Sequence, residues 1–192
     1  MPRPEIDNAD ATECLRTVMR VLIDESDRGC VLAGAAWLDE LLGNLLMAKF
    51  NLESDGAEKS INFLLVNLPE PPLQNSGRKR HLCRALGLIS DEMLERLGNL
   101  FRIRSRYFAH FSGPRSLADT DIQKDVHAFV KTYDLGWIPL VFADMSEAPM
   151  SFERQHFIAT VALLWMEIGL AIKSVQKSQS TQTEDTHDRP SQ

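Results

Sequence analysis

The chain has 192 residues and a formal net charge of −6, with 44% hydrophobic and 25% charged residues. This composition is ordinary for a globular protein that is long enough to bury a core. An acidic balance argues against a surface that binds nucleic acid through bulk positive charge, although it leaves room for a local basic patch.

The cysteines and the N-terminal sequence indicate the cellular compartment of the protein. Cys14, Cys30 and Cys83 are far apart and odd in number, so they indicate buried thiols in a reducing compartment rather than disulfides or a metal site. The N-terminal sequence MPRPEIDNAD has no apolar signal core, and no uncharged apolar run of about 18 residues predicts a membrane span. We therefore expect a cytoplasmic protein that makes no membrane contact.

Helical periodicity extends through nearly the whole chain. Apolar residues surround most of the second predicted helix, which places it at the centre of a bundle. Ser90 is a suitable N-terminal cap, and Thr120-x-x-Gln123 reads as a capping box. The apolar spacing predicts helices over residues 11–23, 28–50, 58–67, 90–111, 120–131 and 151–175.

Other segments lack this periodicity. Residues 78–81, RKRH, are expected to form a basic turn, and residues 133–150 an aperiodic segment that packs on the bundle. The polar residues 174–192 predict a disordered tail. We therefore predict an all-α, single-domain bundle of about six to seven helices over residues 1–173, with at least one long connection.

Arg104 is the most informative residue, because it lies within the apolar stripe Leu97, Phe101, Phe108 of one predicted helix. A guanidinium group cannot lose its charge, so a buried arginine must find an anionic or carbonyl partner. One interpretation is a structural ion pair with an acidic residue of the central helix. The candidates for that pair are Asp39 and Glu40. The alternative is a functional site.

A second row on the same helix contains Arg102, Arg106 and His110, each four residues apart. This row is either a solvated basic face or a site for an anion such as phosphate. Arg104 and His110 also fit an Arg-x(5)-His pattern. In such a pair, histidine could move a proton at a ribose hydroxyl while arginine stabilises charge on phosphorus.

A second basic cluster consists of Arg78, Lys79, Arg80, His81 and Arg84. It is either a solvated loop or a contact with nucleic-acid backbone, and it has no means of reading bases.

Motifs for other chemistry are missing from the sequence. It contains no phosphate-binding glycine-rich loop, no nucleophile elbow, no paired-cysteine zinc pattern and no convincing helix-turn-helix. We therefore expect no cofactor and no metal ion.

Three segments together resemble the mannitol operon repressor family of bacterial regulators. They are residues 26–50, residues 72–73 with 85–90, and residues 103–122, in the family's order, and they cover roughly residues 26–130. The resemblance implies a compact all-α intracellular protein that represses sugar-alcohol uptake genes through a partner protein. The chain departs from the family at Arg78, Arg80 and Arg84, where apolar residues are usual.

The third segment is also similar to HEPN domains, all-α modules that include many dimeric ribonucleases. Arg104 and His110 match the Arg and His of their motif, while Ser105 replaces the polar amide or acid that often follows the arginine. This second resemblance implies a ribonuclease or a toxin-like RNA-binding protein.

The leading interpretation is a non-enzymatic, repressor-like regulator of a sugar-alcohol or carbohydrate uptake operon. It would bind a protein partner or, as the second choice, nucleic acid directly but without a recognised DNA-reading motif. Its apolar helices leave room for a homodimer. The alternatives are the ribonuclease and a purely structural dimerisation module. The expected binding residues are Arg102, Arg106, His110, Arg78, Arg80 and Arg84.

Overall fold

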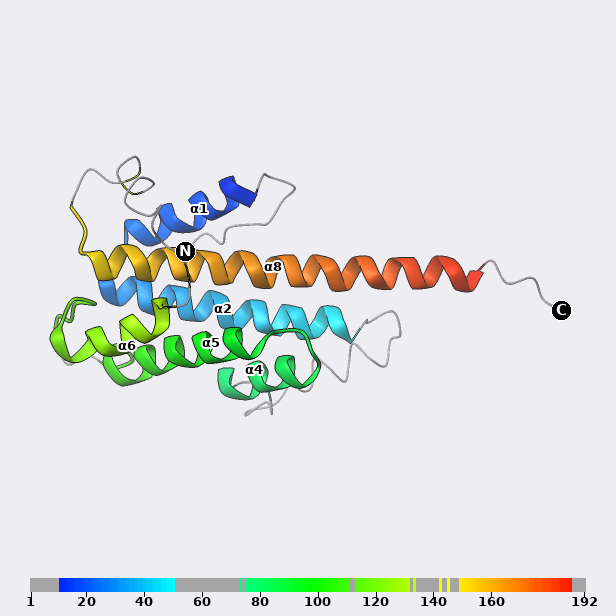
Figure 1. Ribbon diagram of the computed structural model, residues 1–192, viewed down its shortest axis with the longest axis horizontal. Coiled ribbons are helices and arrows are strands. Elements are labelled where there is room, and N and C mark those ends of the chain that lie inside the picture. The colour runs from blue at the N-terminus through cyan, green and yellow to red at the C-terminus, as the bar shows by residue number, and fades with distance from the viewer. Residues whose placement is uncertain are drawn as a thin grey trace. The chain divides into compact units, whose positions relative to one another are not determined.

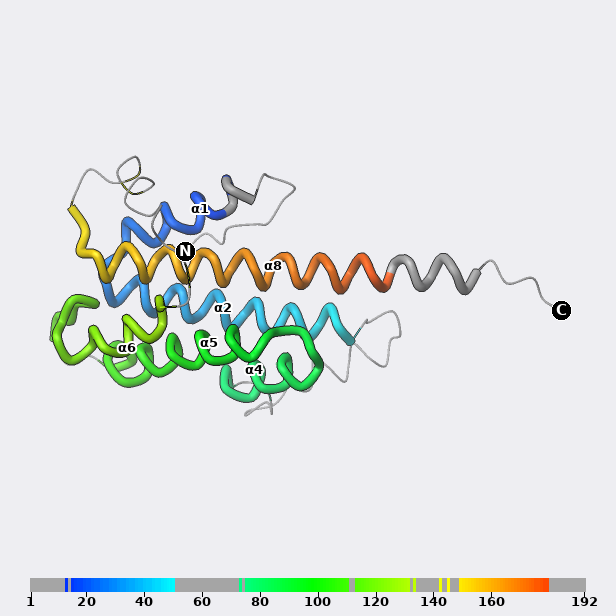
Figure 2. The backbone as a smooth tube through the Cα atoms, viewed as in Figure 1, coloured from blue at the N-terminus to red at the C-terminus, as the bar shows by residue number. Residues whose placement is uncertain are grey.

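The computed structural model describes residues 11–50, 73, 75–110, 113–131, 133, 142, 145 and 149–187 (Figure 1). Figure 2 follows the same backbone as a tube. All regular elements in these residues are helices, so the predicted all-α fold class is confirmed. The predicted helix over residues 58–67 lies outside the described residues, as does most of the segment 133–150. The helices are α1 (Ala11–Ile23), α2 (Asp27–Lys49), α4 (Ser76–Ala85), α5 (Asp91–Ile103), the π-helix η1 (Arg104–Phe108), α6 (Thr120–Val130) and α8 (Phe152–His187) (Figure 1).

The chain forms two compact units, each assembled from separate stretches of sequence. The first unit comprises residues 1–38 and 91–166, and the second comprises residues 39–90 and 167–192. The N-terminal parts of α2 and α8 therefore belong to the first unit, and their C-terminal parts belong to the second.

The core of the first unit is built from helices that are distant in sequence. The rings of Phe129 and Phe157 lie 5.2 Å apart between centroids and are both fully buried. Burying such a side chain contributes roughly 1.5–3 kcal/mol. Gly34 of α2 faces Val161 of α8 so closely that a Cβ atom at Gly34 would lie 3.0 Å from a Val161 methyl group. The absence of a side chain at Gly34 thus permits the close approach of these two helices.

A partly buried ion pair joins three segments of the first unit. The Arg154 guanidinium contacts Asp27 Oδ1 at 2.9 Å and donates to the Ile23 carbonyl at 3.0 Å. Asp27 Oδ2 accepts hydrogen bonds of 2.8 Å from Ser116 Oγ and from the Leu117 amide. The α1–α2 turn, the segment before α6 and the start of α8 are therefore held by one carboxylate.

The second unit packs α4 against the C-terminal part of α2. Asn75 caps α4 by accepting a 2.7 Å hydrogen bond from the Gly77 amide. Lys79 Nζ lies 2.7 Å from Asp39 Oδ2, and the buried Cys83 donates to the Leu42 carbonyl. These contacts fix the buried face of α4.

The basic turn expected at residues 78–81 is wrong, because these residues lie inside α4. The buried face of this short helix consists of Lys79 and Cys83, four residues apart. A helix face that contains a lysine does not show the apolar periodicity that identifies an amphipathic helix in a sequence. The place of Lys79 on the buried face is explained only by its tertiary contact with Asp39.

The last helix is longer than its apolar pattern predicts, since α8 continues past Val175 to His187. No glycine or proline interrupts residues 170–187, and the Gln179 side chain donates to the Ala48 carbonyl at 2.8 Å and to the Lys49 carbonyl at 3.2 Å. The polar sequence of this stretch is compatible with an exposed helix. The remaining residues of the predicted disordered tail, 188–192, lie outside the described residues.

Two helices are long and apolar enough to cross a membrane by length and composition, namely α2 and the Phe152–Gln179 part of α8. Of their apolar spans, 61% and 50% respectively are buried inside the protein. Central helices of a soluble bundle have the same character. The expectation that no segment spans a membrane stays a prediction.

Candidate interaction site

The predicted site residues of the first unit lie on α5, η1 and α6. In Figure 1, α5 and α6 lie side by side, and the side-chain amide of Asn99 donates to the Ala128 carbonyl at 3.3 Å. Leu100 and Ile103 are fully buried on α5, and Ile122, Val126 and Phe129 are fully buried on α6. This packing holds the outward-facing side chains of α5 and η1 beside α6.

A π-helical turn changes the register at the end of α5. The Ala109 amide donates to the Arg104 carbonyl at 2.7 Å, a bond across five residues rather than four. The wider turn rotates less per residue than an α-helix, which brings Phe108 back onto the face of Leu100 and Ile103. Phe108 is 1% exposed, whereas Arg104 is exposed.

The buried ion pair predicted for Arg104 is therefore wrong. Arg104 lies at the edge of the buried face, and the π-turn leaves it in solvent. Asp39, one of its two expected partners, pairs with the buried Lys79, and Glu40, the other, is exposed. The uniform helical period used for the prediction does not hold beyond Ile103.

Arg102 and Arg106 converge on a single carboxylate, that of Asp125 on α6. Arg102 Nη2 lies 3.3 Å from Asp125 Oδ1, and Arg106 Nη1 lies 3.8 Å from Oδ2. The Tyr107 hydroxyl donates to Oδ2 at 3.0 Å and also lies 3.1 Å from the Asp121 carbonyl. The side chains of Arg102 and Arg106 are 50% and 65% exposed, whereas that of Asp125 is 14% exposed.

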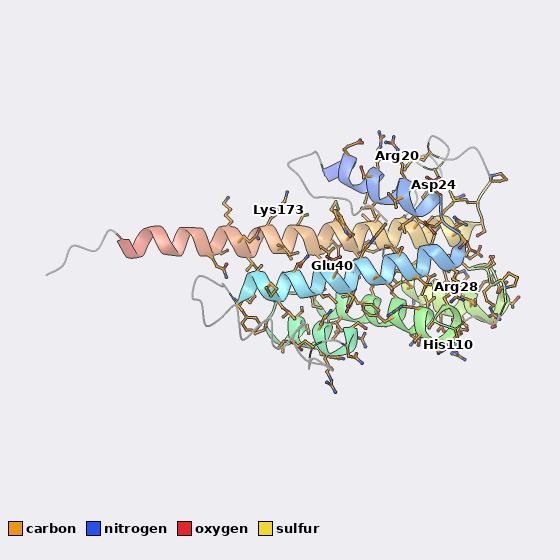
Figure 3. All side chains as sticks on the ribbon, turned by 180° about the vertical axis from the view of Figure 1, so that it is seen from behind. Arg20, Asp24, Arg28, Glu40, His110 and Lys173 are labelled. Carbon is orange, nitrogen blue, oxygen red and sulfur yellow. The ribbon has the colours of Figure 1, made fainter. Side chains whose placement is uncertain are left out.

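His110 lies just beyond η1, and its side chain is exposed. Its backbone carbonyl accepts a hydrogen bond from Arg28 Nη1 at 3.3 Å, and Figure 3 shows the two residues near one another. The two arginines share Asp125, and His110 contacts α2 through its main chain.

A further ion pair borders the Tyr107 ring. Arg115 Nη2 lies 2.5 Å from Asp121 Oδ2, and this contact lowers the pKa of Asp121 and raises the pKa of Arg115. Desolvation, followed by the hydrogen bond to Asp125, raises the pKa of Tyr107. The phenol therefore stays a neutral donor to Asp125 at physiological pH.

Sequence reasoning missed the residues that α6 contributes. Asp125 was not singled out, although it is the group on which both arginines converge. Lys124 and His127 are exposed on α6, three residues apart, and the exposed Lys131 follows the helix four residues later. That helical spacing of cations is a sequence signal that could have been used.

The second basic cluster is divided by α4. Lys79 is 9% exposed and pairs with Asp39, while Arg78 and His81 are exposed. Arg80 is partly buried, and desolvation lowers its pKa. The expected solvated loop is thus a helix with one cation directed into the second unit.

Among the described residues, no group of three His, Cys, Asp or Glu side chains could hold a metal ion. Cys30 and Cys83 are free, buried thiols, and burial raises the pKa of each to about 12. Such thiols are protonated at neutral pH and are poor nucleophiles.

The fold and the site define an all-α bundle with two exposed arginines held beside one carboxylate. No protein-family model matches the sequence, and no curated protein matches it. A chain in the X-ray structure of the MtlR–HPr complex from Escherichia coli is similar in fold, with a TM-score of 0.62 and 15% sequence identity. The match covers 81% of this chain and 98% of that chain. A similarity at this identity shows a common fold, and it agrees with the family resemblance of the three sequence segments.

Proposed function

We propose that this protein is a non-enzymatic regulator that acts by binding a protein partner. The observation that carries the proposal is the similarity in fold to a chain that was solved in complex with HPr. The three family-like sequence segments support it independently, because they are a property of the amino-acid sequence and not of the fold.

The surface of α5, η1 and α6 is the candidate contact for that partner. Arginine is favoured at protein interfaces because its planar guanidinium makes paired hydrogen bonds and is only weakly hydrated. Arg102 and Arg106 are at least half exposed and therefore accessible. His110 extends this candidate surface, and Arg78, Arg80 and Arg84 on α4 form a second one.

The proposal extends to the regulated genes, the cellular compartment and the oligomeric state of the protein. We propose that it represses a sugar-alcohol or carbohydrate uptake operon, in the cytoplasm, and that it forms a homodimer. Size-exclusion chromatography with light scattering tests the last part, since a monomer mass at every concentration would contradict it.

Binding to HPr is the first test. Isothermal titration calorimetry with HPr from the source organism should give saturable binding to the wild type and weaker binding to Arg102→Ala/Arg106→Ala. A matched control is Arg16→Ala/Lys173→Ala, which removes the same charge from two other exposed positions. Equal binding by both double variants would exclude the proposed surface.

The regulatory part needs a measurement in cells. Deletion of the gene should raise the transcripts of a carbohydrate uptake operon, and the Arg102→Ala/Arg106→Ala protein should fail to restore repression. No HPr binding, combined with no change in any transcript, would overturn the proposed function.

A further inference from the structure

We propose that Arg102 and Arg106 bind carboxylate groups on an acidic surface of the partner protein, and that Asp125 competes for the same two arginines. This inference rests on the proposed function in one respect, namely that the partner is a protein. It adds the chemistry of recognition and an internal competitor.

The geometry indicates that the cluster can surround one carboxylate. Arg102, Arg106 and Tyr107 approach the two oxygens of Asp125 from η1 and the end of α5, at 3.3, 3.8 and 3.0 Å. Paired guanidinium groups with an adjacent hydroxyl are a donor set suited to a carboxylate. Asp125 thus occupies the position that an external anion would take.

The two arginines hold Asp125 loosely. Contacts of 3.3 and 3.8 Å are longer than good charge-assisted hydrogen bonds, and the side chains of Arg102 and Arg106 are 50% and 65% exposed. Arg102 Nη2 also donates to the neutral Asn99 side chain at 2.9 Å, so its firmest contact carries no charge. Ion pairs of this kind contribute little to stability. Tyr107 holds Asp125 more closely, at 3.0 Å, so the carboxylate keeps a partner when the arginines turn to an external group.

The charge of the cluster favours a protein carboxylate over a nucleic acid. Arg102, Arg106 and Arg115 are balanced in part by Asp121 and Asp125, and the whole chain carries a net charge of −6. Binding to a phosphate backbone draws on many cations that neutralise successive phosphates. Two arginines that already share the carboxylate of Asp125 can bind one or two external carboxylates.

Fluorescence anisotropy with a short, labelled polyglutamate peptide tests the proposal. Asp125→Asn removes the competing charge while its amide oxygen can still accept from Tyr107. We expect this variant to bind the peptide about threefold to tenfold more tightly than the wild type. Arg102→Ala/Arg106→Ala should lose binding. Asp24→Asn, which removes one exposed acid elsewhere on the first unit, should bind like the wild type.

Three results of the peptide experiment would overturn the inference. They are equal affinity of the wild type and Asp125→Asn, an equal gain from Asp24→Asn, and stronger binding of a labelled single-stranded oligonucleotide than of the peptide. HPr binding that Asp125→Asn leaves unchanged would remove this inference and leave the proposed function standing.

A measurement on the wild type covers the case in which Asp125→Asn does not fold, as judged by circular dichroism. Peptide addition should shift the NMR signals of the Arg102 and Arg106 Nε groups and leave that of Arg16 unchanged. An absence of shifts at Arg102 and Arg106 would refute the proposal.

Discussion

The Asp27 carboxylate and the Arg154 guanidinium lie 2.9 Å apart, although 126 residues separate them in the chain. Their side chains are 13% and 18% exposed, and Asp27 also accepts two hydrogen bonds from the Ser116–Leu117 segment. A pair that is mostly shielded from water is costly to break, because the remaining charge loses its counter-ion and, in the case of Arg154, keeps only the backbone carbonyls of Ile23 and Glu25.

Asp27→Ala should therefore lower the free energy of unfolding by about 3 kcal/mol, measured by urea denaturation. Arg20→Ala, at an arginine that is 61% exposed and lies 3.9 Å from Glu13, should lower it by no more than about 0.5 kcal/mol. A loss below about 1 kcal/mol in Asp27→Ala would mean that the pair is not a principal link of the first unit.

Two glycines of α2 should respond differently to substitution by alanine. Gly43 has open space at the Cβ position, so Gly43→Ala should stabilise the protein by roughly 0.5–1 kcal/mol through helix propensity. At Gly34 a Cβ would meet Val161 at 3.0 and 3.2 Å, so Gly34→Ala should bring no gain or a loss. Thermal unfolding of the two variants provides the comparison, and equal gains at both sites would argue against the close approach at Gly34.

Lys79 should behave as a core residue of the second unit rather than as a surface cation. Lys79→Ala leaves Asp39 without its 2.7 Å partner and should cost about 2 kcal/mol of the free energy of unfolding. Lys173→Ala, at an exposed lysine of the same unit, is the control and should change stability by less than about 0.5 kcal/mol. Similar values for the two variants in denaturant unfolding would contradict the buried position of Lys79.

The buried thiols should be inert in the folded protein. In a Cys14→Ser background, Cys30 and Cys83 should react with a thiol reagent only on unfolding, because burial raises the pKa of both to about 12. The ordinary pKa of a thiol is 9.0, so the unfolded chain loses these protons at a lower pH than the folded protein does. The free energy of unfolding is therefore unaffected below pH 9 and declines as the pH rises from 9 towards 12. Fast labelling of both thiols under native conditions would show that they are accessible.

RNA cleavage should be absent from the wild type and from Arg104→Ala/His110→Ala alike. Phosphodiester cleavage requires a proton-transfer group and a charge-stabilising group at one phosphate. Arg104 lies on η1 and His110 beyond it, both exposed, and no hydrogen bond joins them among the residues that the structure describes. Cleavage of single-stranded RNA by the wild type alone would restore the ribonuclease interpretation.

Local pattern was sufficient for much of the fold. The helix predicted over residues 11–23 has the bounds of α1, and that over 120–131 differs from α6 by one residue. Apolar periodicity and capping residues act within a few helical turns, so they can be identified from the sequence. The exposed arginines 102 and 106 were predicted on the same basis, as a ridge with a spacing of four residues.

The register at Arg104, the burial of Lys79 and the role of Asp125 depended on tertiary structure. The π-turn at Arg104 follows from packing Phe108 into the first unit, and Lys79 becomes a core residue only because Asp39 meets it across the α2–α4 contact. Asp125 reaches Arg102 and Arg106 because α6 packs beside α5. Sequence by itself thus determined which segments are helical, since helix signals are local. Only the tertiary structure decided which charges are buried and which groups meet, since those depend on contacts between residues far apart in the chain.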